Sequence, residues 1–422
     1  MSAGLAICSI GAKSTLSQAR VLARSFRRHH PENPFFLLLA DEIDGYFDPL
    51  SEPFQLLTLT DLQIPNIQAF RFAHADNELR YAATPFLLRH LLDRGYASVG
   101  FMKEESLVLA SLLPILSIVA EHSITLTPHI LSPLQGLEAA EREVVALCSG
   151  IFNVGFLGVS ATPAARHFLD WWTGRVYGDC SHDIGRGQHY EQRWLDLVPA
   201  QFDDVHILRD PGFNVGHWNL PERWVTSDGA QFWVGGHLCR YVRMSGYEFD
   251  LPERATRYFG RLSMSALGDA AQIFRRYYQA LAMEGYQVTR HWPYACVAFS
   301  NGVTVPQIAR QIFRGLGPGQ SRFDDPFRAG ENSFFAWING HDEKAEATAQ
   351  NPAPGWEPCL PKQRATVESP SITRLWKAVY RGRPDLQRAF PDPDGVDRDR
   401  FLSWTVHHGL QEHQISADFL VR

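Results

Sequence analysis

The 422-residue sequence has no hydrophobic run that could cross a bilayer, which takes about 20 consecutive apolar residues, so no transmembrane segment is expected. It also has no excess of basic residues. The formal net charge is −6, which argues against a protein that binds nucleic acid through its phosphates. The first residues, Met1–Ile10, lack a charged n-region and a cleavage site, so we expect them to form the first strand of a mature cytoplasmic protein.

A dinucleotide cofactor, a disulfide framework and a metal site also find little support in the sequence. The loop after Ser14 is not rich in glycine, so a nicotinamide or flavin enzyme is not expected. The six cysteines are scattered, as is typical of reduced thiols in the cytoplasm. Cys180, His182 and Asp183 are the only candidate fragment of a metal site, and their spacing matches no standard zinc pattern.

The residues that are present predict a globular α/β protein. The hydrophobic content is 45% and the charged content 20%, and the length favours two domains and a tail. Leu5–Ile10 and Phe35–Ala40 are continuous apolar strands separated by a helix over residues 16–30. Because such strands are typical of a sheet covered on both faces, we expect a largely parallel sheet flanked by helices.

The character of the chain changes near residue 265, where long amphipathic helices begin. Residues 341–366 are rich in Ala, Pro and Gln, a composition typical of a flexible linker. The predicted organisation is an α/β domain over residues 1–264, a helical appendage over 265–340, a linker over 341–366 and a C-terminal helical tail over 367–422.

One stretch has the character of a functional site. The buried strand Ser98–Met102 ends in a charged corner, Lys103-Glu104-Glu105. Open α/β sheets bind ligands at the carboxyl ends of their strands, so this corner is a candidate site. The alternative is a solvated turn. Asp41, which closes the second strand, has the same two interpretations, because an acid there often binds a ribose hydroxyl.

Two later stretches add polar candidates. The strand Ile151–Val159 contains Asn153 and Gly155, and a glycine inside a strand indicates either a ligand close to the backbone or a bulge. Glu191 and Gln192 are expected to open a helix that ends before Pro199. Glu191 is then either part of the site or an acid that interacts with the helix dipole.

The segments that follow form a polar, aromatic loop and a predicted hairpin. Asn214, His217 and Trp218 lie in the loop, where Trp218 either stacks on a ligand or belongs to the core. We expect Gln231–Val234 and His237–Arg243 to pair as the hairpin that leads into Ser245 and Gly246.

Ten stretches spread over nearly the full chain carry a family resemblance: Ala19–Phe26, Leu126–His129, Phe152–Phe156, Phe168–Trp172, Trp194–Pro199, His206–Val215, Trp292–Ala295, Asn301–Val303, Arg383–Gln387 and Phe390–Asp392. Together they resemble a family of bacterial GT-A-fold glycosyltransferases that is related to the glycogenin-like retaining enzymes of polysaccharide and glycoconjugate clusters.

The resemblance implies a GT-A fold with a Rossmann-like, nucleotide-sugar-binding sheet. It also implies transfer of a sugar from a nucleotide-sugar donor with retention of the anomeric configuration. The acceptor would be a glycan, a lipid-linked molecule, a peptide or a small molecule. In the family an Asp-Pro-Asp motif and a histidine hold a divalent metal on the donor diphosphate. Here Lys103, Glu104 and Glu105 replace the first motif and Arg243 replaces the histidine.

These substitutions predict metal-independent transfer. Mg²⁺ and Mn²⁺ prefer oxygen ligands, so Lys103 and Arg243 disfavour a metal, and no cofactor is expected to be required. Arg243 is suited to bidentate contacts with phosphate and Lys103 to stabilisation by a point charge. The alternatives are conventional metal-dependent transfer and a catalytically inactive protein that serves as a binding or scaffold partner.

The candidate residues fall into three groups. The catalytic candidates are Glu191, Gln192, Arg243 and Lys103. The donor-binding candidates are Glu105, Asn153, Gly155, Asp41, Glu78, Ser245 and Gly246. The acceptor-binding candidates are Asn214, His217 and Trp218. The tail after residue 366 is a candidate docking segment for a second copy of the chain or for a partner enzyme.

Overall fold

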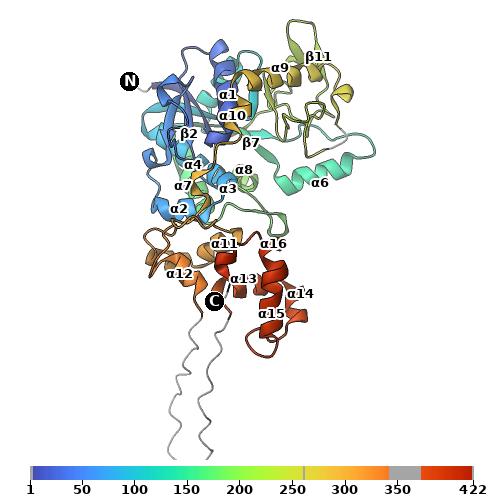
Figure 1. Ribbon diagram of the computed structural model, residues 1–422. Coiled ribbons are helices and arrows are strands. Elements are labelled where there is room, and N and C mark those ends of the chain that lie inside the picture. Colours follow the sequence, from blue (N-terminus) through green and yellow to red (C-terminus); the bar gives the residue numbers. More distant parts are fainter. Residues whose placement is uncertain (1–2, 260–261, 342–371, 421–422) are drawn as a thin grey trace, which may run out of the picture. The chain divides into compact units, whose positions relative to one another are not determined.

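The computed structural model describes residues 3–259, 262–341 and 372–420 (Figure 1). The chain divides into two compact units, residues 1–296 and 297–422. The first unit contains a seven-stranded sheet with helices on both faces, and the second unit is helical. The predicted fold class, an α/β sheet flanked by helices with a C-terminal helical region, is therefore confirmed.

The central sheet is parallel apart from one strand. Its strands, in order across the sheet, are β10 (Val205–Ile207), β6 (Ile124–Pro128), β7 (Phe152–Ser160), β4 (Tyr96–Met102), β1 (Ala3–Gly11), β2 (Phe35–Leu39) and β3 (Gln55–Thr58). Only β7 runs antiparallel to its neighbours β4 and β6. The first residues of β7 consequently lie at the edge where the parallel strands end, beside the end of β4.

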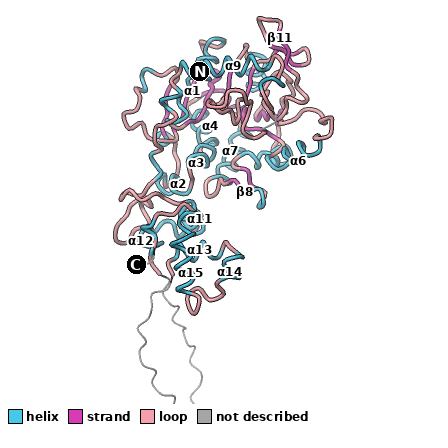
Figure 2. Tube along the Cα trace, turned by 45° about the vertical axis from the view of Figure 1, so that its right-hand side comes forward, coloured by secondary structure: helices cyan, strands magenta, loops and turns pink. Residues whose placement is uncertain are grey.

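Helices cover the sheet on both faces, and Figure 2 shows the strands between them. Successive side chains of a strand point to opposite faces. Ala6 and Cys8 of β1 therefore pack with α4 (Thr84–Asp93) and α7 (Pro163–Val176). Ile7 packs on the other side with α1 (Leu16–His29) and α5 (Leu113–Glu121). The two apolar cores fix the central strand β4 and the corner that follows it.

The first unit extends beyond the predicted boundary at residue 264. Helix α9 (Ala270–Met283) buries Ile273, Phe274 and Tyr277 in a third core with residues from the loops after Val215. Helix α10 (Tyr286–Thr289) follows, and Thr289 Oγ1 lies 3.1 Å from Ser17 Oγ. The division falls after Cys296 because the apolar face of α9 completes the core of the first unit.

Two predictions of local structure were wrong. No helix runs from Glu191 to Pro199, since a 3₁₀ segment (Gln192–Leu197) leads into α8 (Val198–Gln201). Pro199 lies in the first turn of α8, where its missing N–H has no helical partner to lose, so it helps to begin a helix and does not end one.

The predicted hairpin is only partly formed. Strands β12 (Phe232–Val234) and β13 (His237–Leu238) pair as expected, together with β11 (Val225–Ser227). The rest of the second segment turns away, and β14 (Tyr241–Arg243) pairs antiparallel with β5 (Ser106–Val108), which follows the charged corner.

The remaining elements are short. In the first unit they are α2 (Ile67–Ala73), α3 (Asp76–Ala82), α6 (Ala139–Ser149), β8 (His182–Asp183) and β9 (Gln188–His189). In the second unit they are α11 (Gln307–Gly315), α12 (Phe334–Asn339), α13 (Arg374–Arg381), α14 (Pro384–Ala389), α15 (Arg398–Trp404) and α16 (Leu410–Glu412). The predicted linker, residues 341–366, lies almost entirely outside the described residues. Among the described helices, none combines the length and the hydropathy needed to cross a membrane.

Candidate active site

The charged corner after β4 is buried. The backbone N–H of Lys103 donates to the carbonyl oxygen of Gly155 over 3.1 Å, which continues the pairing of β4 with β7 beyond Met102. Lys103 is 7% exposed and Glu104 4%. The interpretation of this stretch as a solvated turn is therefore wrong, because two charged side chains there are removed from water.

Arg243 is brought to the same corner by the pairing of β14 with β5. Arg243 lies opposite Ser106, and its Nη2 donates to Glu105 Oε1 over 2.7 Å. Burial by itself lowers the pKa of Arg243, but the negative charge of Glu105 outweighs it and raises that pKa. Arg243 thus presents a permanent positive charge that is only 6% exposed.

Lys103 and Glu191 form a buried ion pair. The Lys103 Nζ lies 3.8 Å from Glu191 Oε1 and 3.5 Å from the centre of the Tyr81 ring, a cation–π distance. Burial lowers the pKa of Lys103 and raises that of Glu191, and each residue partly offsets the shift of the other. Glu191 is therefore not a solvated acid of a helix terminus, and its carboxylate faces the site.

We expect Lys103→Met to lower the free energy of unfolding by about 3 kcal/mol, because it leaves the buried Glu191 carboxylate without its counter-ion. The double variant Lys103→Met/Glu191→Gln should recover most of that loss. Urea unfolding of the wild type, Lys103→Met, Glu191→Gln and the double variant at pH 7.5 measures the coupling.

The pH dependence of that loss has a defined sign. Burial raises the pKa of Glu191 above its ordinary value of 4.5, so ionisation of Glu191 opposes folding as the pH rises through the folded-state pKa. The deficit of Lys103→Met should shrink below pH 4.5. A deficit that is independent of both pH and the second substitution would contradict the pairing.

The donor set at the corner does not fit a divalent metal. Glu104 Oε1 accepts from Arg80 Nη1 over 2.6 Å, and Glu105 is bound by Arg243. The first residue of the corner is the cation Lys103. A metal needs several free oxygen ligands, whereas both carboxylates here are already engaged by arginines. Among the described residues, no group of three or more His, Cys, Asp or Glu side chains is arranged to hold a metal.

Gly155 lies where side chains from three segments converge. A Cβ at this position would come within 2.3 Å of Asn153 Oδ1, 2.5 Å of Asn214 Oδ1 and 2.6 Å of Arg243 Nη1. Asn153 Oδ1 accepts from the backbone N–H of Gly155 over 2.8 Å and from Asn214 Nδ2 over 3.2 Å. The structure therefore brings these donor-side and acceptor-side candidates together against the backbone of β7.

His129 extends this network. Asn153 Nδ2 donates to His129 Nε2 over 2.8 Å, so that ring nitrogen is the acceptor. Burial lowers the pKa of His129 to about 3, which keeps the ring neutral at pH 7. The indole N–H of Trp218 donates to the His129 carbonyl oxygen over 3.1 Å. Trp218 is half-buried, and its ring lies edge-on to that of His129 with the ring centres 5.7 Å apart.

Five buried polar atoms of the site have no hydrogen-bond partner among the described residues: Arg80 Nε, Glu104 Oε2, His129 Nδ1, Asn214 Oδ1 and Arg243 Nε. An unsatisfied buried polar atom costs about 1–3 kcal/mol, and such atoms are rare in folded proteins. Asn214 also has a left-handed backbone with φ of 55°. Strained backbone and unpartnered polar atoms both concentrate at functional sites.

His217 provides a prediction on pH. Burial lowers its pKa to about 4 from the ordinary 6.5, so the folded state takes up a proton less readily than the unfolded state. The free energy of unfolding should therefore fall as the pH drops from 6.5 to 4. We expect His217→Gln to reduce that fall by about 2 kcal/mol, measured by urea unfolding at a series of pH values. An unchanged pH profile in the variant would contradict the lowered pKa of His217.

Several predicted residues have other partners. The side-chain amide of Gln192 binds backbone through both of its polar atoms. Its Oε1 accepts from the Val154 N–H over 2.9 Å, and its Nε2 donates to the Ser149 carbonyl oxygen over 2.9 Å. Gln192 thus positions the start of β7. Asp41, just after β2, accepts backbone N–H groups that include that of Ala295, over 2.9 Å.

Three other donor-side candidates, Glu78, Ser245 and Gly246, lie in segments that adjoin the charged corner. Glu78 accepts from the backbone N–H of Ala75 over 2.9 Å at the start of α3. Ser245 and Gly246 form the turn that follows Arg243, and the Ser245 carbonyl accepts from Thr256 Oγ1 over 2.9 Å. These contacts fix the start of α3 and the turn after Arg243.

Sequence reasoning missed three residues of the site: Arg80, Tyr81 and His129. Arg80 and Tyr81 lie on α3 and reach the corner only because that helix packs beside β4. A buried carboxylate such as that of Glu104 needs a cationic partner, but the sequence does not indicate which of the many arginines supplies it.

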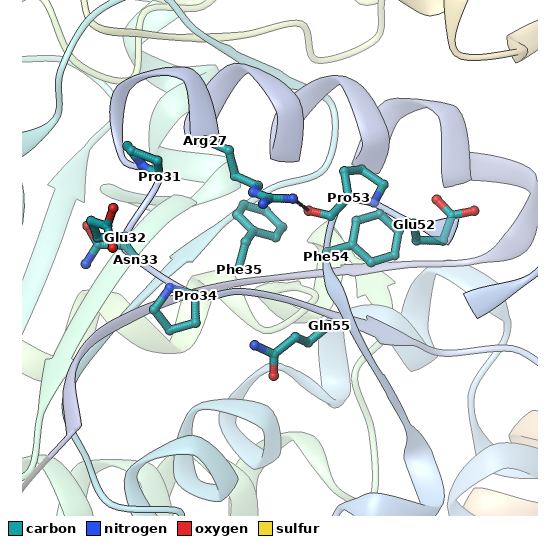
Figure 3. Close-up of a pocket in the computed structure, with 10 residues that line it drawn as sticks. All are labelled: Arg27, Pro31, Glu32, Asn33, Pro34, Phe35, Glu52, Pro53, Phe54 and Gln55. Carbon is teal, nitrogen blue, oxygen red and sulfur yellow. Dashed lines mark hydrogen bonds between the residues drawn. The ribbon is translucent and has the colours of Figure 1, made fainter. Parts of the chain in front are cut away.

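A surface hollow of about 410 Å³ lies elsewhere, where β2 and β3 begin (Figure 3). Arg27 points across it and donates to the Pro53 carbonyl over 3.2 Å. This hollow contains none of the predicted site residues, and it lies at the opposite ends of the strands from the charged corner.

No protein-family model matches the chain. The uncharacterized protein YfnF of Bacillus subtilis (strain 168) is 24% identical over 248 residues, which is 57% of this chain and 81% of the relative. YfnD of the same organism is 26% identical over 101 residues, which is 24% of this chain and 32% of the relative.

Two solved structures have a similar arrangement of elements. The galactosyltransferase LgtC, in complex with donor and acceptor sugar analogs, is 13% identical and covers 66% of this chain and 95% of its own, with a TM-score of 0.38. The glycosyltransferase GlyE of Streptococcus pneumoniae TIGR4 is 12% identical and covers 70% of this chain and 67% of its own, also with a TM-score of 0.38. The functional inference therefore rests on the site itself.

Proposed function

We propose that the chain is a glycosyltransferase that moves a sugar from a nucleotide-sugar donor to an acceptor with retention, without a metal ion. The observation that carries this proposal is the buried corner at the end of β4. Two cations, Lys103 and Arg243, converge there on a strand end lined by Asn153, Gly155 and Glu191. Two of the stretches that resemble retaining GT-A-fold enzymes, Phe152–Phe156 and His206–Val215, contribute Asn153, Gly155 and Asn214 to this corner.

The chemistry requires stabilisation of a leaving diphosphate. The bond between the anomeric carbon and the phosphate oxygen breaks, and the diphosphate leaves with the electron pair. The acceptor hydroxyl forms the new bond on the same face, and its proton passes to the departing phosphate oxygen. Arg243 and Lys103 would neutralise the charge that develops on the diphosphate, as preorganised cations do in sites from which water is excluded.

The carboxylate of Glu191 would face the sugar, which carries positive charge in an oxocarbenium-like transition state. Its pairing with Lys103 keeps it beside the corner. Asn153 and Gly155 would line the donor sugar, and Asn214, His217 and Trp218 the acceptor. Location in the cytoplasm and docking of a partner through the C-terminal tail remain predictions.

A panel of nucleotide sugars tests this function. Each donor is incubated with the full chain, and release of the nucleoside diphosphate and the shift in melting temperature are measured with Mn²⁺ and with EDTA. Turnover of at least one donor in EDTA is expected, with a raised melting temperature, since a ligand that binds the folded state stabilises it. Absence of turnover and of any melting shift across the panel would favour the inactive scaffold.

A further inference from the structure

The segment Thr256–Tyr258 is fixed against the turn that follows Arg243. Arg257 N–H donates to the Gly246 carbonyl over 2.8 Å, and Thr256 Oγ1 donates to the Ser245 carbonyl over 2.9 Å. Gly246 has a φ of 70°, and a Cβ there would lie 2.6 Å from the Tyr258 ring. The Tyr258 ring therefore packs directly on the turn, and only a glycine leaves room for it.

Tyr258 nevertheless remains 59% exposed. Its ring centre lies 5.7 Å from that of His217, and the His217 and Trp218 rings lie 5.3 Å apart. An exposed aromatic ring that is held in place offers a stacking surface at little cost in conformational entropy, because it has few rotatable bonds to fix. Its position beside His217 and Trp218 extends the proposed acceptor side of the site.

Arg257 differs from the other cations of the region because it has no carboxylate partner among the described residues. Lys103, Arg80 and Arg243 each pair with a carboxylate. Arg257 donates from Nη2 to the Tyr258 hydroxyl over 3.1 Å, and no carboxylate in the described part of the chain forms an ion pair with it. The hydrogen bond to Tyr258 and the nearby charge of Glu105 raise the pKa of Arg257, so it carries its charge at every working pH.

We propose that Arg257 and Tyr258 form an oxyanion-binding subsite, in which the ring stacks on a sugar and the guanidinium binds a carboxylate or phosphate group of the substrate. An arginine binds such groups through two parallel hydrogen bonds. The inference rests on the proposed function, because it assigns a substrate group to that same site. The anion has two possible sources with one chemistry: an acidic acceptor sugar, or the diphosphate of the donor.

NMR titration of small molecules into the full chain tests the subsite. The ligands are glucuronate, glucose and inorganic pyrophosphate, applied to the wild type, Arg257→Gln and the control Arg254→Gln. Arg254 is exposed and lies three residues earlier on the same segment. We expect Arg257→Gln to weaken either glucuronate or pyrophosphate about tenfold and to leave glucose unchanged, since a charge-assisted hydrogen bond is lost.

The pattern of losses identifies the source of the anion. A loss confined to glucuronate assigns an acidic acceptor, and a loss confined to pyrophosphate assigns the donor diphosphate. Equal binding by wild type and Arg257→Gln, an equal loss for glucose, or the same loss in Arg254→Gln would overturn the subsite. Tyr258→Leu should weaken both sugars, whereas Tyr258→Phe should retain the stacking.

The outcome for the subsite is separable from that for the proposed function. These titrations need no turnover, whereas the donor panel measures turnover directly. Oxyanion binding that depends on Arg257, in a chain that turns over no donor, would support the subsite and contradict the glycosyltransferase.

Discussion

Replacement of Arg243 by alanine is expected to lower the turnover of the preferred donor by about 100- to 1,000-fold, the range seen when one preorganised group that stabilises transition-state charge is removed. Arg243 is buried at the corner, and its Nη1 is one of the three atoms closest to the position that a Cβ on Gly155 would occupy. Arg243→Lys keeps the charge but loses the bidentate geometry, so an intermediate loss is expected. EDTA should leave the wild-type rate unchanged.

Arg240→Ala is the matched control for Arg243→Ala. Arg240 lies just before β14, and its Nη1 donates to the Ser111 carbonyl over 2.5 Å, away from the corner. Its replacement should leave the rate within about twofold, because the partners of its side chain, Ser111 and Asp210, are not among the residues of the corner. Circular dichroism and urea unfolding establish that both variants fold.

Two results would contradict the role of Arg243. One is an Arg243→Ala variant that is folded and retains the wild-type rate. The other is a wild-type enzyme that loses its activity in EDTA and regains it with Mn²⁺, which would restore the metal-dependent alternative.

The second large effect is expected from Gly155→Ala, a change of one methyl group. The added Cβ would lie within 2.6 Å of Asn153 Oδ1, Asn214 Oδ1 and Arg243 Nη1, closer than packed atoms approach. At least one of these side chains must move. We expect a loss of stability of about 2 kcal/mol, as is usual for overpacking of a tight site. We also expect a loss of turnover of about 100-fold, because small displacements of positioning groups are costly.

Gly174→Ala controls for the loss of a glycine. Gly174 lies inside α7, and apart from the neighbouring backbone of that helix no heavy atom of the described residues lies within 4 Å of the position of an added Cβ. Alanine there should stabilise the chain by about 0.5–1 kcal/mol through its higher helix propensity. Kinetics and urea unfolding on both variants separate the two effects. If Gly155→Ala behaved like Gly174→Ala, the convergence of side chains on Gly155 would have no functional role.

Much of the fold follows from local patterns in the sequence. The apolar runs that became β1, β2, β4 and β7 are evident because strands that are buried on both faces need nearly continuous hydrophobic residues. The charged corner after Met102 is evident for the same reason, since Lys103-Glu104-Glu105 interrupts such a run. The glycine of Asn153-Val154-Gly155 indicated a close approach to the backbone, which three side chains in fact make.

Local patterns failed where short segments had more than one suitable partner. His237–Arg243 has the composition of a hairpin strand, but its last residues pair with β5. Pro199 ends or begins a helix according to the turn that precedes it. The apolar face of α9 gave no indication of the unit to which it packs, and that placement moved the boundary to residue 296.

The sequence by itself determined which charged residues follow the strand that ends at Met102, and the family resemblance predicted that Lys103 and Arg243 stand where a metal-binding motif would place an aspartate and a histidine. Only the tertiary structure decided their partners. Arg243 pairs with Glu105 across 138 positions of the chain, Lys103 with Glu191, and Glu104 with Arg80. The physical reason is that an ion pair depends on distance in space and on burial, and both are set by how strands and helices pack rather than by their order along the chain.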